Sequence, residues 1–269
     1  MNLTISQVSK YMIFVIVWLK MLKKVRIISL INAFIFLSFS ANATYLISKD
    51  KIVFAGEPFN GIIAPSLTID QLPYKKAEVK SSLSLVIMGQ LGNAFFEGNR
   101  FGYLFNRTQY GAFAAVGQIR AHQYIELNDQ HTEDKDKAFE AGLQWSKPLG
   151  YGWVSQVSLF QDVSDTHHGQ EMELAFYRRD NFDKFRLLTM FSAQQQSQSL
   201  TSYYTDAENY QADADLNFEL ELIGVYEITS RLNALMVYRH YLHGSGLKNS
   251  PLTQSDQTKR LILGLGWSF

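Results

Sequence analysis

The sequence predicts an all-β fold: a single antiparallel transmembrane β-barrel of about twelve strands with both chain ends on the same, periplasmic side. Three observations predict this fold. The chain begins with an export signal, apolar and polar side chains then alternate with a period of two, and short and long connections alternate between these segments. With 269 residues, length alone permits one large β domain or two ordinary domains.

Residues 1–43 carry the export signal. A positively charged start around Lys23 precedes an apolar run over residues 27–39, and Ala43 offers a small residue for cleavage. The apolar run is shorter than the about 20 residues that span a bilayer as a helix, so a membrane anchor is the less favoured alternative. We therefore expect cleavage near Ala43 and a mature barrel domain of residues 44–269.

Upstream of this signal lies a second apolar stretch, residues 11–19, and a complete signal could begin at Met21, where we expect translation to start.

Residues 1–43 hold five basic side chains and no acidic one, which leaves 20 basic and 25 acidic residues in the mature domain. A net charge of −5 without a basic patch argues against a nucleic-acid partner.

Composition also favours a β-rich protein. Aromatic residues make up 14% of the chain, and a mean hydropathy of −0.10 is too polar for a helical membrane protein. Cysteine is absent, which excludes disulfide bonds and thiolate metal sites. No motif calls for a cofactor, and we expect none.

Alternation is clearest in the last segment, where one face is wholly apolar and consists of Leu261, Leu263, Leu265, Trp267 and Phe269. Residues 216–222 and 232–239 alternate in the same way with half-polar second faces. Further strands are expected at 93–106 (a hairpin), 110–122, 139–146, 153–163, 171–179 and 184–193, with a first strand within 45–70.

The connections separate a barrel from a soluble β-sandwich, which also alternates. Short turns are expected on the periplasmic side, at 107–109, 147–151, 181–183 and 229–231; the other side has longer loops at 124–136, 195–215 and 243–257, with short exceptions at 97–100 and 164–168. This asymmetry is typical of bacterial outer-membrane barrels. In lipid, every unpaired backbone group at a sheet edge costs several kcal/mol, so the sheet must close.

Aromatic side chains gather near the predicted periplasmic boundary. Trp145, Tyr151, Trp153 and Trp267 would form an aromatic girdle there, because amphipathic rings settle at the lipid interface. Ordinary core packing is the alternative role.

The last strand ends on Phe269, with Leu265 and Trp267 on the same apolar face. Such an end resembles the signal that the outer-membrane barrel assembly machinery reads. Together with the export signal, it indicates a protein of the Gram-negative outer membrane whose outer face contacts outer-membrane lipid.

Charged residues on the inner faces form a candidate lumen cluster. If residues 216–220 place their apolar side chains in lipid, a short turn at 229–231 sets Glu221 opposite Arg239. These side chains either line a small aqueous path or form a salt-bridged plug, and we favour the plug because about twelve strands leave little open interior. The predicted cluster comprises Glu171, Glu173, Arg186, Glu219, Glu221 and Arg239.

Two sequence features suggest chemistry. His243-Gly-Ser245 resembles the His-x-Ser arrangement of the outer-membrane phospholipase, but no acid or Asn is placed by a motif to orient the base, so a Gly-rich loop start is the favoured interpretation.

His167 and His168, beside Asp162 and Asp165, offer metal ligands without the ligand spacing of a metal site. We expect no catalytic residues and no metal site.

Several stretches resemble the MipA/OmpV family of MltA-interacting outer-membrane proteins. They are residues 94–102 (AFFEGNRFG), 160–164 (FQDVS) followed by 169–171 (GQE), 202–207 (SYYTDA), 238–241 (YRHY), Ser250-Pro251, and the end Trp267-Ser-Phe269. The resemblance covers about residues 90–269, whereas residues 44–80 lack the glycine-rich first strand that the family usually has.

The resemblance implies a non-enzymatic barrel that scaffolds peptidoglycan-remodelling enzymes, with a lytic transglycosylase and a peptidoglycan synthase as partners. A partner would bind the short periplasmic turns weakly or use residues 44–80, because a stable interface needs about 1,200 Å² or more. The alternatives are a small-solute, porin-like channel and, from another class, an outer-membrane lipid hydrolase.

Overall fold

The computed structural model describes residues 52–54, 57–75, 77, 79–120, 125–128, 131–133, 135–207 and 209–269. The expected signal peptide, its cleavage near Ala43, the start at Met21 and residues 44–51 lie outside the described residues. None of the helices in the described part of the chain is long and apolar enough to cross a bilayer.

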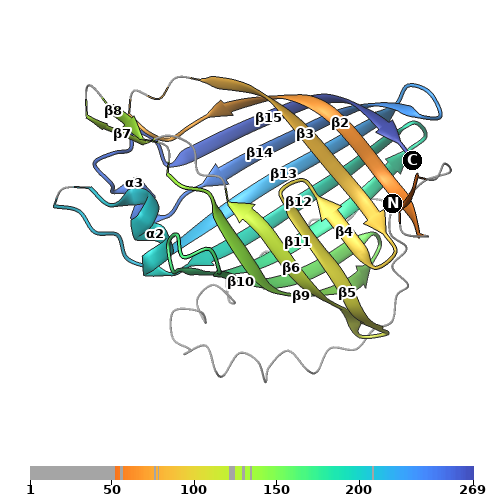
Figure 1. The fold of residues 1–269 in the computed structure, drawn as a ribbon, viewed down its shortest axis with the longest axis horizontal. Coiled ribbons are helices and arrows are strands. Elements are labelled where there is room, and N and C mark those ends of the chain that lie inside the picture. Colours follow the sequence, from red (N-terminus) through yellow and green to blue (C-terminus); the bar gives the residue numbers. More distant parts are fainter. Residues whose placement is uncertain are drawn as a thin grey trace, which may run out of the picture. The chain divides into compact units, whose positions relative to one another are not determined.

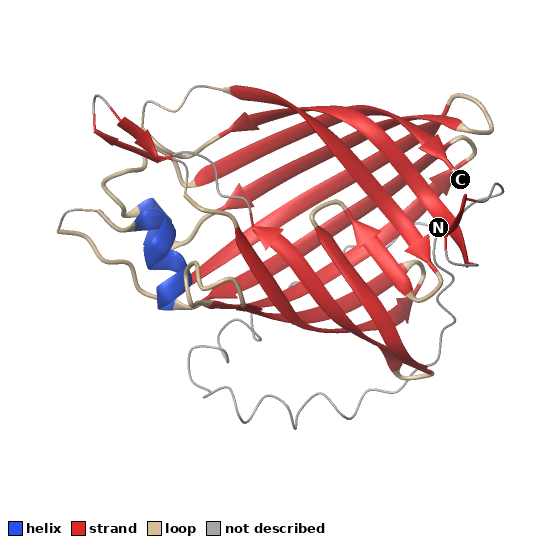
Figure 2. Ribbon diagram, in the orientation of Figure 1, coloured by secondary structure: helices blue, strands red, loops and turns tan. Residues whose placement is uncertain are grey.

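Twelve antiparallel strands close into a barrel, as the sequence predicts (Figures 1 and 2). The sheet runs from β2 through β15, β14 and onward to β3, and β2 pairs with β3 to complete the circle. In chain order the elements are β1 (Ile52–Phe54), β2 (Glu57–Gln71), β3 (Lys80–Leu91), β4 (Ala94–Glu97), β5 (Arg100–Thr108), β6 (Gly111–Arg120), β7 (Ile125–Asn128), β8 (His131–Glu133), β9 (Ala138–Gly150), β10 (Trp153–Asp162), β11 (Gln170–Phe182), β12 (Phe185–Gln196), α2 (Gln198–Thr205), β13 (Asp215–Glu227), β14 (Leu232–Leu242), α3 (Ser245–Lys248) and β15 (Gln257–Ser268).

The two ends of the barrel differ. At one end, here called the turn end, neighbouring strands are joined by tight turns and β15 finishes beside the start of β2. At the other, the loop end, lie α2, α3 and the small β7–β8 hairpin (Figure 2). The turn between β9 and β10 has the backbone geometry of a two-residue hairpin turn, because Tyr151 and Gly152 both adopt positive φ. The sequence predicts the uneven connections, but not the helices within them.

Strand register sets which side chains face lipid. Leu222 pairs with Tyr238 and Tyr238 with Leu261, so this row points outward, while the neighbouring row pairs Glu221 with Arg239 and Arg239 with Arg260. The faces follow the predicted alternation in β13, β14 and β15. Inner and outer faces therefore differ as lipid demands, with large apolar side chains outside.

The interior toward the turn end is filled by two apolar clusters. One joins residues of five strands, with Val86, Val225, Leu235 and Val237 among its buried members. The other consists of Leu104, Ala112, Ala114, Val116 and Phe160 on the opposite wall. Toward the loop end, the inward-facing side chains are mostly polar or charged. The candidate site lies in this polar part of the interior.

Candidate functional site

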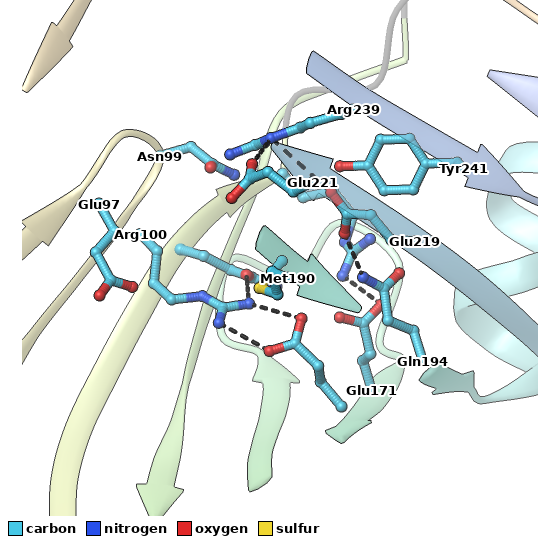
Figure 3. Close-up of a pocket in the computed structure, with 13 residues that line it drawn as sticks. Glu97, Asn99, Arg100, Glu171, Met190, Gln194, Glu219, Glu221, Arg239 and Tyr241 are labelled. Carbon is cyan, nitrogen blue, oxygen red and sulfur yellow. Dashed lines mark hydrogen bonds and ion pairs between the residues drawn. The ribbon is translucent and has the colours of Figure 1, made fainter. Parts of the chain in front are cut away.

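A charged cavity of about 150 Å³ lies inside the barrel toward the loop end (Figure 3). Its walls come from β4, β5, β6, β11, β12, β13 and β14. The residues that line it are Glu97, Asn99, Arg100, Gln118, Arg120, Glu171, Glu173, Met190, Gln194, Glu219, Glu221, Arg239 and Tyr241. Four members of the predicted lumen cluster lie on this wall beside Arg239, although their role stays a prediction.

Arg239 on β14 pairs with Glu221 directly across the β13–β14 ladder, at the register expected from the sequence. Its Nε donates a hydrogen bond to Glu221 and lies 3.9 Å from Oε1 of Glu219. Gln194 Nε2 donates to the other oxygen of Glu219 at 3.0 Å. One guanidinium and one amide thus hold two buried carboxylates.

Arg100, the first residue of β5, crosses the interior to β11. Its two terminal nitrogens donate to Glu173 at 2.8 and 3.1 Å, a two-pronged contact that fixes the carboxylate plane. The guanidinium also lies over the ring of Phe160, 4.9 Å from its centroid. This contact ties β5 to strands that are not its neighbours in the sheet.

Arg120, the last residue of β6, bridges two carboxylates. Its Nε donates to Glu140 at 2.9 Å and a terminal nitrogen donates to Glu171 at 2.8 Å. On the far side of Glu140 lies buried His167, whose Nδ1 accepts the backbone N–H of Gly169 at 3.0 Å. Nε2 of that ring is 3.1 Å from Glu140, so the β10–β11 loop packs onto the charged network.

Arg186 faces the interior but lies near the turn end, apart from Glu171 and Glu173. It sits opposite Asn181 in the β11–β12 ladder and donates a 3.5 Å hydrogen bond to Oδ1 of Asn233. The sequence placed all three side chains on the inner face, and the register explains the separation: Glu171 pairs with Gln196, at the other end of β12.

The charges of the cavity do not balance. Five lining carboxylates, Glu97, Glu171, Glu173, Glu219 and Glu221, stand against three guanidiniums. Four of the five accept hydrogen bonds from Arg or Gln, whereas the side chain of Glu97 makes no hydrogen bond or ion pair with the described residues. With all groups ionised, the wall carries a charge of −2, which favours cations.

Sequence reasoning missed Arg100, Arg120 and Glu97 as site residues. Arg100 stood in a predicted tight turn and Arg120 near the end of a predicted strand. The signal available was alternation, since Arg100, Gln118 and Arg120 fall on inner positions of their strands. Their partners on β9 and β11 follow from register across the loop region 121–137, which a sequence pattern does not specify.

The two features that suggested chemistry have structural roles. Nε2 of His243 is 2.7 Å from Oγ1 of Thr258, and Ser245 begins α3. Burial lowers the pKa of His243 to about 4, which makes the ring a weak base.

Asp162 caps the β10–β11 loop by accepting backbone N–H groups of residues 164 and 166–168. His167 is buried, while His168 is exposed and pairs with Asp165 at 3.1 Å. In the described ranges, no group of three His, Cys, Asp or Glu side chains is placed to hold a metal ion.

The predicted girdle residues lie on the outer face near the turn end. Trp145 packs against Phe113 with ring centroids 6.5 Å apart, and Arg178 lies 5.9 Å from the ring of Trp153. Tyr151 and Trp267 are exposed. Leu265 shares the outer face of β15, and Phe269 packs 6.3 Å from Phe59. Their roles as girdle and assembly signal remain predictions.

A closed barrel with an apolar exterior and a charged, largely paired interior defines an outer-membrane β-barrel protein. The family model described as MltA-interacting protein MipA matches residues 67–269. The chain therefore belongs to the MipA family, as its motifs indicate, and the match begins further upstream than the resemblance seen in the sequence.

Among solved structures, the chain is similar to outer-membrane expressed OmpT of Vibrio cholerae, with 8% identity over 82% of this chain and 100% of the other and a TM-score of 0.37. A loop L8 deletion mutant of the same protein gives 8% identity, 79% and 99% coverage and a TM-score of 0.37. OccK8 (OprE) of Pseudomonas aeruginosa is 8% identical over 76% of this chain and 78% of the other, with a TM-score of 0.28. Scores this low carry no inference about function. No curated protein matches the chain.

Proposed function

We propose that this protein is a non-enzymatic barrel that anchors a peptidoglycan-remodelling enzyme, a lytic transglycosylase, at the outer membrane. The observation that carries the proposal is the family match, because the family is described by its interaction with MltA. A peptidoglycan synthase is a second candidate partner. The exported barrel would present its turn end, with both chain ends, to the periplasm where these enzymes work.

The interior supports an anchoring role over a transport role. Two apolar clusters fill the lumen toward the turn end, and the carboxylates beyond them are mostly held by Arg and Gln. A solute crossing the barrel would have to displace both kinds of packing. The small-solute channel remains the second candidate, favoured by the charged cavity alone.

The binding surface follows from the fold. Residues 57–71 form β2 and residue 80 begins β3, so these parts of the range 44–80 belong to the barrel wall. The use of the range by a partner stays a prediction. Residues 44–56, which precede β2 in the sequence, and the tight turns are the parts that we propose for a partner. Since the turns alone offer little area against the about 1,200 Å² of a stable interface, residues 44–56 would provide most of it.

A pull-down tests the proposal. Mature protein in detergent, with and without residues 44–56, is incubated with envelope extract, and the recovered proteins are identified by mass spectrometry. An unrelated outer-membrane barrel serves as the control. We expect a lytic transglycosylase with the full mature chain and at least tenfold less with the shortened one, which corresponds to about 1.4 kcal/mol. Recovery equal to the control barrel would contradict the proposal.

A further inference from the structure

The turn end of the barrel carries an excess of positive charge. The four turn segments 105–111, 147–153, 178–186 and 226–233 hold seven basic and three acidic residues, and the start of β2 adds one further acidic residue, Glu57. The expected mature domain as a whole has the opposite sign, with 20 basic and 25 acidic residues. Positive charge gathered at one end of an acidic protein favours an anionic partner at that end.

Arg186, near the start of β12, is a positive charge of this end that lacks a carboxylate partner. It takes an inward position, because it pairs with Val225, a member of an apolar cluster in the interior. Its half-buried side chain uses Nη2 to donate the 3.5 Å hydrogen bond to Asn233, and it makes no ion pair with the described residues, Glu227 on the neighbouring β13 included. A guanidinium has five N–H donors, so most of them are left for a ligand. An anion bound here would offset the cost of burying this charge.

Two further arginines lie beside Arg186. Arg179 on β11 takes the inward position diagonal to it, because Asn181 is the residue that pairs with Arg186. Diagonal neighbours on one face of a sheet are about 7–8 Å apart, within reach of long side chains. Arg231 lies in the β13–β14 turn, where its carbonyl accepts a 3.2 Å hydrogen bond from Nδ2 of the same Asn233 that contacts Arg186. We call these three arginines the inner rim.

The place of the inner rim restricts what can bind there. Arg186 faces the interior and not lipid, so an anion reaches it through water from the turn end, which is the end that we propose to face the periplasm. Buried Val225 and Leu235 close the interior beyond it, so a slender chain end fits better than a broad protein surface. The planar fork of arginine matches a carboxylate. Peptidoglycan, the polymer of the periplasm, offers flexible stem peptides with free carboxylates.

We propose that the inner rim binds the carboxylates of peptidoglycan stem peptides, so that the barrel itself contacts the cell wall. Arg186 receives the carboxylate, while Arg179 and Arg231 add positive charge beside it. This contact is independent of the proposed anchoring role, because it needs no partner protein.

Co-sedimentation with purified, protein-free peptidoglycan sacculi measures the contact. The mature protein in detergent should sediment with native sacculi and at least tenfold less with sacculi whose carboxylates have been amidated. Arg186→Gln should weaken binding about tenfold, as expected for the loss of one charge-assisted hydrogen bond. Arg178→Gln is the matched control, since this arginine of the same turn segment faces outward and pairs with Asp180 at 2.7 Å, and it should bind as the wild type does.

Thermal unfolding and competition complete the test. Arg186→Gln removes a charge without a carboxylate partner and should leave the unfolding temperature unchanged. A soluble disaccharide-tetrapeptide fragment should displace the protein from sacculi, and polyglutamate at the same carboxylate concentration should displace less. Equal sedimentation with amidated sacculi, wild-type binding or a lowered unfolding temperature of Arg186→Gln, or stronger displacement by polyglutamate, which would assign the site to an acidic protein segment, would each overturn the proposal.

Discussion

The wall formed by β13, β14 and β15 and the wall around β4 differ in how completely they are paired. In the first, continuous ladders bring each inner side chain against a chosen neighbour, as with Glu221 and Arg239. In the second, β4 has four residues and pairs with β3 only over residues 88–91, and the side chain of Glu97 has no hydrogen-bond or ion-pair partner among the described residues. Pairing offsets the cost of burying a charge, so the two walls differ in how their carboxylates are held.

The largest expected effect is at the paired wall. Arg239→Met leaves the buried Glu221 and Glu219 without their cation, and we expect a loss of about 3–5 kcal/mol in the free energy of unfolding. Arg178→Met, which removes a half-exposed ion pair with Asp180 at the outer rim, should cost less than about 1 kcal/mol. Urea unfolding in lipid vesicles measures both values. Equal losses would remove the distinction between inner and outer charges.

Apolar packing gives the next effect. Leu235 is 2% exposed within the lumen cluster, so Leu235→Ala should lower the free energy of unfolding by about 2–4 kcal/mol. Leu83→Ala, on the outer face of β3, removes an exposed side chain that faces lipid and should change the free energy of unfolding by less than about 1 kcal/mol. The same unfolding experiment measures the pair. A loss of less than about 1 kcal/mol for Leu235→Ala would mean that the interior at the turn end is loosely packed.

Acid should weaken the loop end where β14 leaves the barrel. Burial depresses the pKa of His243 to about 4, so the folded protein keeps this ring neutral while the unfolded chain, with the ordinary value of 6.5, takes up a proton. Stability present above pH 6.5 is therefore lost as pH falls toward 4, by about 3 kcal/mol. His243→Gln should flatten this part of the stability profile. A variant with the wild-type slope would show that other groups carry it.

The smallest effect is expected at the β4–β5 turn. Gly98 has a φ of 70° and open space where a side chain would project, so Gly98→Ala meets backbone strain alone and should cost about 1 kcal/mol. Gly142, on β9, has the Leu159 carbonyl where a Cβ would stand, and Gly142→Ala should cost more. Thermal unfolding compares the two variants. A larger loss of stability for Gly98→Ala than for Gly142→Ala would mean that the backbone is packed more tightly at the β4–β5 turn than at Gly142.

The same contrast explains what the sequence can predict. Long alternating segments joined by short turns fix the faces of β13–β15 and the Glu221–Arg239 pair, because turn length sets register. Arg120 and Glu140 lie on neighbouring strands, β6 and β9, which the long loop region 121–137 joins, and a loop of that length does not fix their register. Alternation also does not predict that β4 is short, because the sequence pattern of residues 93–106 predicts an ordinary hairpin of two strands. α2 and α3 are likewise too short for a periodic signal.

Single-channel recording tests most directly whether the interior is filled. The mature protein, folded in detergent and inserted into a planar bilayer at neutral pH, is expected to show no steady conductance, because the turn-end clusters and the ion pairs around Arg239 occupy the path. A steady, ion-selective conductance that Glu221→Gln alters would contradict this expectation.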